Sequence, residues 1–224
     1  MPRLPDPAPV VRLRSVTVDL DGHRALHDVT LDASAGRLLA VVGANGSGKS
    51  TLLSVTAGLQ TPTTGGVELT SGTRIAFVAQ TKTDGARLPL TVTDLVSMGR
   101  WRERGALRPL RRSDRDRVAE AIDTIGLTAH ARRPIGALSG GQRQRAFLAQ
   151  ALAQEADLLL LDEPMTGLDE RSRVAAASAI AAVAAHGAAV IAVTHDVDEL
   201  GHADAIVRLV DGRLATPSPG SLDA

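Results

Sequence analysis

The chain has 224 residues, no cysteine and a formal net charge of zero at pH 7. The absence of cysteine excludes disulfides and thiolate metal sites, and it suits a reducing compartment. Zero net charge argues against a protein that wraps nucleic acid through bulk electrostatics. Residues 1–9 lack the apolar core of a secretory signal. The alanine-rich stretch Ala175–Val193 is interrupted at His186-Gly187, which favours a surface helix followed by a strand over a membrane span.

The first elements in chain order have the alternation of β-strands. Residues 10–35 alternate apolar and polar side chains around the turn signal Asp21-Gly22, which predicts antiparallel strands. Pro62–Gly66 reads as a loop, and Val67–Val78 reads as a hairpin around Ser71-Gly72.

Between these strand regions lies a glycine-rich segment, GANGSGKST at 43–51, directly after the apolar run Leu38–Val42. Glycines let the backbone curl and aim N–H groups at phosphate oxygens, Lys49 reaches the terminal phosphates, and the Ser50 hydroxyl ligates Mg²⁺. The chain has 23 arginines and only two lysines, yet it keeps a lysine here, where a compact ammonium fits between phosphates. We therefore predict a nucleoside triphosphate site, with a helix continuing to about Leu59. Its further candidate residues are Gly43, Asn45, Gly46, Ser47, Gly48 and Thr51.

From Thr81 to about Gln154 the pattern is helical and rich in arginine. Ser113 is the expected N-cap of a helix that ends at Gly126. The segment Thr91–Arg117 carries eight arginines around Trp101. It reads either as a solvated basic face or as a surface for a partner; a nucleic-acid surface is weakened by the lone aromatic and the zero net charge.

The motif LSGGQ at 138–142 has the pattern of a capping box, with Ser139 as N-cap and Gln142 three residues later, before a helix over Arg143–Ala153. Capping does not explain Gly140 and Gly141, which cost helix stability in an exposed first turn. A helix N-terminus with bare N–H groups makes a second phosphate site. A head-to-tail dimer, with each nucleotide between two chains, would use both sites.

From Asp157 the chain alternates strand, helix and strand, which implies parallel strands with crossover helices. Four leucines, 158–161, predict a strand buried on both faces, and Asp162 and Glu163 emerge at its end. We interpret Asp162 as holding Mg²⁺ through water and Glu163 as polarising the attacking water. His195 follows the next expected core strand, Ala189–Val193, near the phosphate loop. The last expected strand is Ile206–Val210, and the tail from Thr216 is expected to be disordered.

At this point the sequence resembles the nucleotide-binding subunits of ABC transporters, over about residues 10–215. The motifs stand in the family's order; they are GANGSGKST at 43–51, Gln80 after a strand, LSGGQ at 138–142, LLLLDEP at 158–164, TGLD at 166–169, and His195 after a strand. The resemblance implies an α/β fold of the P-loop NTPase type, with a mostly parallel core sheet, an antiparallel β-subdomain and an α-helical subdomain. It implies a single domain over 1–224, with the core in 10–80 and 155–215, the helical subdomain in 81–154 and a flexible tail in 216–224.

The resemblance also implies roles for the matching residues. Lys49, Ser50 and Thr51 contact phosphates and Mg²⁺, and Gln80 senses Mg²⁺ and the attacking water. Glu163 is the general base and His195 contacts the γ-phosphate. The remaining implied contacts are with the nucleotide of the opposite subunit or across the dimer interface, and they involve Ser139, Gly140, Gly141, Gln142 and Asp169. The implied cofactors are ATP and Mg²⁺.

The implied partners are a second copy of the chain, an integral membrane permease and, indirectly, a solute-binding protein, which would place the chain on the inner face of the cell membrane. The wording around Pro89–Arg100 resembles the zinc/manganese importer branch, with zinc the first expectation and manganese the next. A haem or iron-chelate cargo and a non-transport ATPase of cofactor assembly remain alternatives.

One position departs from the family pattern. Members usually place an aromatic ring shortly before the first motif to stack on adenine, and the matching position here is Leu20, with His23 nearby. We therefore expect weaker adenine stacking, by about 1–3 kcal/mol as measured for aromatic–base stacks elsewhere.

Overall fold

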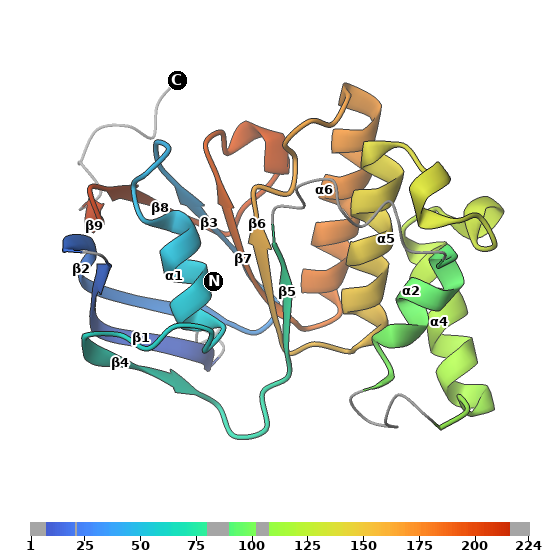
Figure 1. Cartoon of the computed structure of the whole chain (residues 1–224), viewed down its shortest axis with the longest axis horizontal. Coiled ribbons are helices and arrows are strands. Elements are labelled where there is room, and N and C mark those ends of the chain that lie inside the picture. The colour runs from blue at the N-terminus through green and yellow to red at the C-terminus, as the bar shows by residue number, and fades with distance from the viewer. Residues whose placement is uncertain (1–7, 21, 80–89, 102–107, 216–224) are drawn as a thin grey trace, which may run out of the picture.

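Residues 8–20, 22–79, 90–101 and 108–215 are described by the structure, a computed structural model, and they form two β-sheets with helices packed around them (Figure 1). Within these ranges, one sheet has six strands in the order β5-β6-β7-β3-β8-β9 and the other has three in the order β2-β1-β4. The strands are β1 Pro9–Leu20, β2 His23–Ser34, β3 Leu38–Val42, β4 Thr64–Leu69, β5 Ile75–Val78, β6 Leu158–Asp162, β7 Ala189–Thr194, β8 Ala205–Val210 and β9 Arg213–Ala215.

The six-stranded sheet is parallel from β5 to β8, and only β9 joins it in the antiparallel sense. The three-stranded sheet is antiparallel throughout. The structure thus has the predicted α/β fold, with a mostly parallel core sheet and a separate antiparallel sheet. The helices are α1 Lys49–Thr56, α2 Val92–Met98, α4 Arg112–Thr124, α5 Gly140–Ala153 and α6 Glu170–Ala185, with short 3₁₀ helices η2 Thr128–His130, η3 Ile135–Ala137 and η4 Asp198–Leu200.

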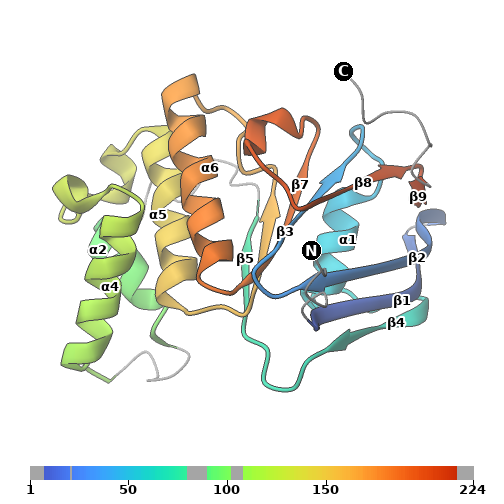
Figure 2. The same ribbon diagram turned by 180° about the vertical axis from the view of Figure 1, so that it is seen from behind.

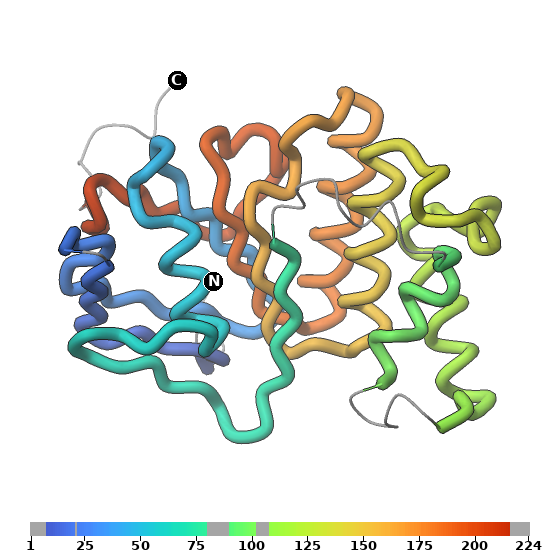
Figure 3. Tube along the Cα trace, viewed as in Figure 1, coloured from blue at the N-terminus to red at the C-terminus, as the bar shows by residue number. Residues whose placement is uncertain are grey.

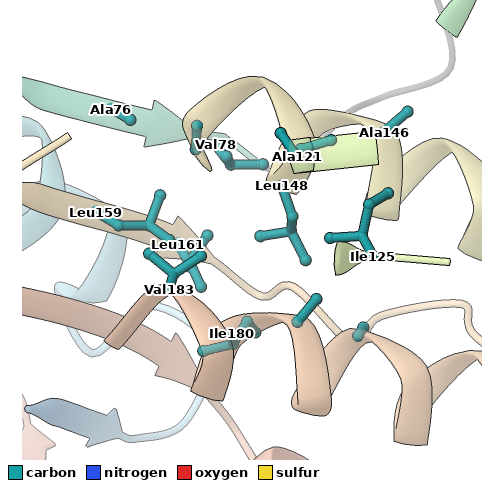
Figure 4. Packing of buried hydrophobic residues seen from close by; sticks show 14 of the residues in the cluster. Ala76, Val78, Ala121, Ile125, Ala146, Leu148, Leu159, Leu161, Ile180 and Val183 are labelled. Carbon is teal, nitrogen blue, oxygen red and sulfur yellow. The ribbon is translucent and has the colours of Figure 1, made fainter. Parts of the chain in front are cut away.

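The core sheet is buried on both faces. Along β6, Leu158 and Leu160 face a cluster formed with α1 and the antiparallel sheet. Leu159 and Leu161 face the other cluster, where they pack against α4, α5 and α6 (Figure 4). Figure 2 shows the same arrangement from behind, with α5 and α6 on one side of the core sheet and α1 and the antiparallel sheet on the other. The four-leucine run was predicted to be a strand buried on both faces, and this prediction is confirmed, since all four side chains have no exposed surface.

The alanine-rich stretch forms the end of α6 and then β7, as predicted. In the part of the chain that the structure describes, no helix is both long enough and apolar enough to cross a membrane.

The predicted hairpin over Val67–Val78 is wrong. β4 pairs with β1, with Val11 opposite Leu69, whereas β5 pairs with β6, with Val78 opposite Leu161. The chain therefore leaves one sheet and enters the other between these strands (Figure 3). Alternation in sequence identifies a strand and its buried side, but it does not identify the partner strand.

The predicted N-cap of α4 is also wrong, because the helix begins at Arg112 and Ser113 lies inside its first turn. Arg111 occupies the cap position, and its N–H donates to Asp114 Oδ2 at 3.0 Å. Asp114 points inward because Arg100 is buried beside it, with Arg100 Nε 3.2 Å from Asp114 Oδ1 and side-chain exposures of 3% and 2%. The helix does end before Gly126, whose φ of +66° suits glycine.

Arg100 is therefore not part of a solvated basic face. Its guanidinium also donates to the carbonyl of Ala153 at the end of α5, at 2.9 Å, and to Glu155 Oε2 at 3.2 Å. These bonds satisfy a charge that would be costly to bury alone.

Candidate functional site

The carboxyl ends of three neighbouring parallel strands bring the candidate residues of the phosphate loop together. In the register, Val42 on β3 lies opposite Thr194 on β7, and Asp162 on β6 lies opposite Val193 on β7. The residues that follow, Gly43, Glu163 and His195, therefore lie along one edge of the sheet. In open α/β sheets this edge is where ligands bind.

The phosphate loop between β3 and α1 is held in shape by its own backbone. Lys49 is 6% exposed, and its Nζ donates to the carbonyls of Gly43 at 2.7 Å and Ala44 at 2.9 Å. Gly48 has φ of +101°, and a Cβ there would lie 2.5 Å from the carbonyl oxygen of Ala25. A Cβ at Gly43 would overlap the carbonyl of Leu209. These two glycines are thus required by close backbone packing.

A cavity of about 380 Å³ lies over this loop. It is lined by Ala25, Asn45, Gly46, Gly48, Lys49, Ser50, Thr51 and Glu163. Gly43 and Ser47 do not line the cavity and lie within the loop. The Ser47 hydroxyl is buried with no hydrogen-bond partner among the described residues. A glycine-rich loop at a helix N-terminus that presents Lys49, Ser50 and Thr51 to a cavity fits a polyphosphate.

The carboxylates at the end of β6 lie in a place that favours a cation. Burial raises the pKa of Asp162, and the neighbouring charge of Glu163 raises it further, whereas a hydrogen bond with Ser50 and the charge of Lys49 lower it. A hydroxyl and a carboxylate side by side are the oxygen ligands that Mg²⁺ prefers, so Ser50 and Asp162 fit that ion.

Glu163 has an unusual backbone for a non-glycine residue, with φ of +46°. Its N–H donates to the carbonyl of Val193 at 3.0 Å, and its Oε2 accepts from the Thr166 hydroxyl at 3.1 Å. This turn lets Asp162 and Glu163 approach the same edge although neighbouring residues of a strand face opposite sides. His195 is exposed, one residue beyond β7. Gln80 lies outside the described residues, so its predicted role stays a prediction.

The second candidate half-site lies at the start of α5. The predicted capping box is present: Gln142 N–H donates to Ser139 Oγ at 3.2 Å, and Ser139 N–H donates to Gln142 Oε1 at 3.0 Å. The helix begins at Gly140, three residues earlier than predicted.

The two glycines of this motif differ in their surroundings. A Cβ at Gly140 would meet open space, which leaves the N-terminus accessible to a ligand. A Cβ at Gly141 would overlap the side chain of Ser172 in the first turn of α6. Gly141 is thus explained by the close packing of two helix N-termini, which the sequence alone did not indicate.

A cavity of about 410 Å³ lies beside these two N-termini. Asp169 caps α6, with Oδ1 accepting from Ser172 N–H at 2.8 Å. Burial lowers the pKa of Arg145, and the charge of Arg171 lowers it further, whereas Asp169 raises it. Two guanidiniums beside two helix N-termini favour an anion, and Asp169 offsets part of their charge. The lining residues are His130, Ser139, Gln142, Arg145, Asp169, Arg171, Ser172 and Ala175.

Sequence reasoning missed His130, Arg145, Arg171 and Ser172 here, and Ala25 at the other cavity. Arg145 lies three residues after Gln142, so helical periodicity could have identified it. His130 carries no spacing signal, because a 3₁₀ helix and a loop separate it from the motif.

The fold and the phosphate loop define an ATPase of the P-loop type. The family model described as "ABC transporter" matches residues 26–166, so the chain belongs to this family, and it is an ABC-type ATPase. The chain is 40% identical over 197 residues to the chelated iron transport system membrane protein YfeB of Yersinia pestis, covering 84% of this chain and 67% of that protein. It is 35% identical over 192 residues to the manganese transport system ATP-binding protein MntB of Bacillus subtilis, covering 83% and 77%.

Solved structures agree with the family. An inward-facing structure described as a metal-chelate type ABC transporter superimposes with a TM-score of 0.83 at 29% identity, covering 93% of this chain and 82% of that one. The dimeric structure of MJ0796, a bacterial ABC transporter cassette, gives a TM-score of 0.76 at 28% identity, covering 92% and 97%.

Proposed function

We propose that this chain is the ATP-binding subunit of a metal importer and that it hydrolyses ATP as a head-to-tail homodimer. One observation carries the dimer: the two candidate half-sites line separate cavities that share no residue. A nucleotide on the phosphate loop of one copy would be completed by the helix N-termini of the other copy. The 28% identical cassette was solved as a dimer, which supports this arrangement.

The charges of the two cavities are complementary. The phosphate-loop cavity has Lys49 together with the two carboxylates at the end of β6, whereas the other cavity is lined by Arg145 and Arg171 together with the single carboxylate of Asp169. Bringing them together around a polyphosphate offsets both surpluses.

Each residue has a proposed task. The loop N–H groups and Lys49 bind and orient the phosphates, and Ser50 and Asp162 hold Mg²⁺, which supplies positive charge to the phosphate oxygens when it is bound. Glu163 accepts a proton from the attacking water, because its carboxylate lines the cavity beside Lys49. The exposed His195 and the N-cap Ser139 contact the terminal phosphate from the two sides, and Gln80 orients the water and reports to the permease.

The transport partners belong to the same proposal. The chain would act from the inner face of the membrane on a separate permease, which a solute-binding protein supplies. The helical segment 81–154 would face that permease, and 10–80 with 155–215 would form the nucleotide-binding core. The names of the relatives, which describe parts of transport systems, support a membrane partner for this chain.

For the cargo, we propose a metal ion or metal chelate, with manganese or iron ahead of zinc. The sequence resemblance put zinc first, but the relatives' names specify manganese and chelated iron. A haem cargo or a role in cofactor assembly is the alternative that is left if the cellular test below finds the contents of all three metals unchanged.

The dimer and the base are tested together with Glu163→Gln. The variant removes the proton acceptor and keeps the shape, so we expect ATP hydrolysis to fall about 100- to 10,000-fold. ATP should then trap a dimer, measured by light scattering after size exclusion. Glu68→Gln, an exposed carboxylate on β4, is the matched control and should behave as wild type. Undiminished turnover in Glu163→Gln would refute the assignment of the base.

The cargo is tested in a strain that lacks the gene and any redundant importer, grown under chelation. We expect manganese or iron content to fall, and to be restored by the wild type but not by Glu163→Gln. Loss of zinc alone would return the cargo to the first sequence-based expectation. Unchanged contents of all three metals would contradict the metal proposal and leave an ATPase of another pathway.

A further inference from the structure

The side-chain amide of Gln142 is held at both ends. Its Oε1 accepts from the N–H of Ser139 at 3.0 Å, as part of the capping box of α5. Its Nε2 therefore faces outward from the cap, where it lies 2.9 Å from Nε2 of His130 on η2. The orientation of the amide is thus fixed by the cap and not by the histidine.

This contact fixes the state of the histidine. An amide NH₂ group only donates hydrogen bonds, so Nε2 of His130 must accept, and the imidazole proton must lie on Nδ1. We propose that His130 is a positioning residue for Gln142, and that it holds the start of α5 in place only while its imidazole is neutral. The proposal rests on the proposed function, because it is the regulation of the same nucleotide half-site.

A protonated His130 cannot keep the contact. Imidazolium would turn an N–H toward the NH₂ group of Gln142, and two donors repel each other. Rotating the amide would restore a bond to His130, but it would then turn the NH₂ group toward Ser139 N–H and break the cap. Protonation of this imidazole would therefore loosen the half-site.

Charged groups of both signs surround His130. From α5, Arg145 lines the same cavity as His130, and from the start of α6 so do Asp169 and Arg171. Asp123, at the end of α4, accepts from the hydroxyl of Thr128 in η2. Arg133, three residues beyond the end of η2, donates its N–H to the His130 carbonyl at 2.8 Å.

The side chain of His130 is not needed to form η2. The turn is closed by backbone bonds, since the N–H of His130 donates to the carbonyl of Leu127 at 2.8 Å. Substitutions of the ring should therefore leave the local backbone in place.

The first test reads the tautomer without nucleotide, by ¹⁵N NMR of the imidazole at pH 8. We expect the proton on Nδ1 of His130, and we expect Gln142→Ala to return the ring to the tautomer mixture of free histidine. A proton on Nε2 in the wild type would overturn the proposal, whatever the protein does with ATP.

The second test uses ATP-driven dimerisation in the Glu163→Gln background at pH 8. His130→Ala should weaken dimerisation about 3- to 10-fold for each of the two half-sites of the dimer, as for one lost neutral hydrogen bond per chain, with the ATP affinity of the monomer unchanged. His130→Gln supplies a carbonyl acceptor and should recover most of the loss. His202→Gln, a change at an exposed histidine, is the control and should have no effect.

The third measurement repeats dimerisation at pH 6. The Glu163→Gln protein should lose about 3- to 10-fold more affinity per half-site between pH 8 and 6 than its His130→Gln derivative, which has no titrating group at this position. His195 is present in both proteins, so its contribution cancels. Equal losses would overturn the switch. Failure of the Glu163→Gln protein itself to dimerise with ATP would instead contradict the proposed function, and the tautomer test would still decide the role of His130.

Discussion

The two nucleotide half-sites differ in what they are built from. The phosphate-loop half lies at strand ends and places carboxylates where burial raises the pKa of Asp162. The other half lies at the N-termini of α5 and α6 and places guanidiniums where burial and Arg171 lower the pKa of Arg145. Two carboxylates outnumber Lys49 in the first half, and two guanidiniums outnumber Asp169 in the second, so the two halves have opposite surpluses of charge. These opposite charges favour the proposed association of two copies of the chain around an anionic nucleotide and its cation.

The halves also differ in how they keep their shape. The phosphate loop is held by backbone packing and by Lys49 on two carbonyls, whereas the start of α5 is held by the side chains of Ser139 and Gln142. We therefore expect changes in the first half to alter ATP binding by the monomer. Changes in the second half should alter closure of the dimer.

Among the changes that separate the two halves, Lys49→Ala is expected to have the largest effect. It removes a buried cation that would bond to phosphate, and hydrogen bonds to charged groups contribute about 1.5–3 kcal/mol, so ATP affinity of the monomer should fall about 10- to 150-fold. The dissociation constant can be measured with a fluorescent nucleotide. Arg12→Ala, an exposed cation on β1, controls for loss of charge. A larger effect on dimer closure than on monomer affinity would break the distinction between the halves.

Gly141→Ala should act on the second half. The added Cβ overlaps Ser172, and overpacking of this kind destabilises by about 1–3 kcal/mol, although alanine is the better helix former. We expect a lower denaturation midpoint and weaker ATP-driven dimerisation with unchanged monomer affinity. Adding Ser172→Gly should restore both, because it removes the overlapping atoms. No recovery in the double variant would show that Gly141 acts through the ligand.

Leu20→Tyr should strengthen the first half by a smaller amount. Leu20 is the last residue of β1, and its side chain is 39% exposed. It pairs with His23, which is two residues before Ala25, and Ala25 lines the phosphate-loop cavity. A stacked ring contributes about 1–3 kcal/mol in other proteins, and partial stacking should tighten ATP binding several-fold. Leu69→Tyr, at another half-exposed strand end, is the control. An unchanged dissociation constant for Leu20→Tyr would remove the adenine-stacking interpretation.

The smallest effect is expected at Asp169. Hydrogen bonds from Ser172 hold the pKa of Asp169 below its usual range. The ionised form therefore stabilises the fold above about pH 4, and this contribution is lost as the pH falls through the lowered pKa. Asp169→Ala should lower the urea midpoint at pH 7, and the gap to wild type should narrow toward pH 3. Asp169→Asn keeps a hydrogen-bond acceptor, so its urea midpoint at pH 7 should lie between those of Asp169→Ala and the wild type. A difference in midpoint between Asp169→Ala and the wild type that does not change with pH would contradict the role of the charge.

Features that depend on neighbouring residues in the sequence were predicted correctly, among them the core strands and the loop that follows one of them. The run Leu158–Leu161 and the loop at 43–51 each combine a strong local pattern with a fixed position in the fold, and both are where the sequence placed them. The capping box of Ser139 and Gln142 is equally local, since both partners lie within one turn.

The features that the sequence predicted wrongly or did not indicate depend on contacts between segments that are distant in the chain. β4 and β5 choose partners in different sheets, and alternation within 67–78 carries no information about partners. Asp114, not Ser113, closes the start of α4, because Arg100 lies beside it in the folded chain. Gly141 is required by the side chain of Ser172, which lies 31 positions later in the chain. The side chain of His130 contacts that of Gln142 across a loop.

The burial of Arg100 has a mechanical consequence. One guanidinium, just beyond α2, bonds to the first turn of α4, to the last residue of α5 and to Glu155, three positions before β6 begins. Charge-assisted hydrogen bonds of this kind fix the relative geometry of the groups that they join. Arg100 thus ties the ends of three helices together beside the turn that leads into β6, the strand whose far end carries Asp162.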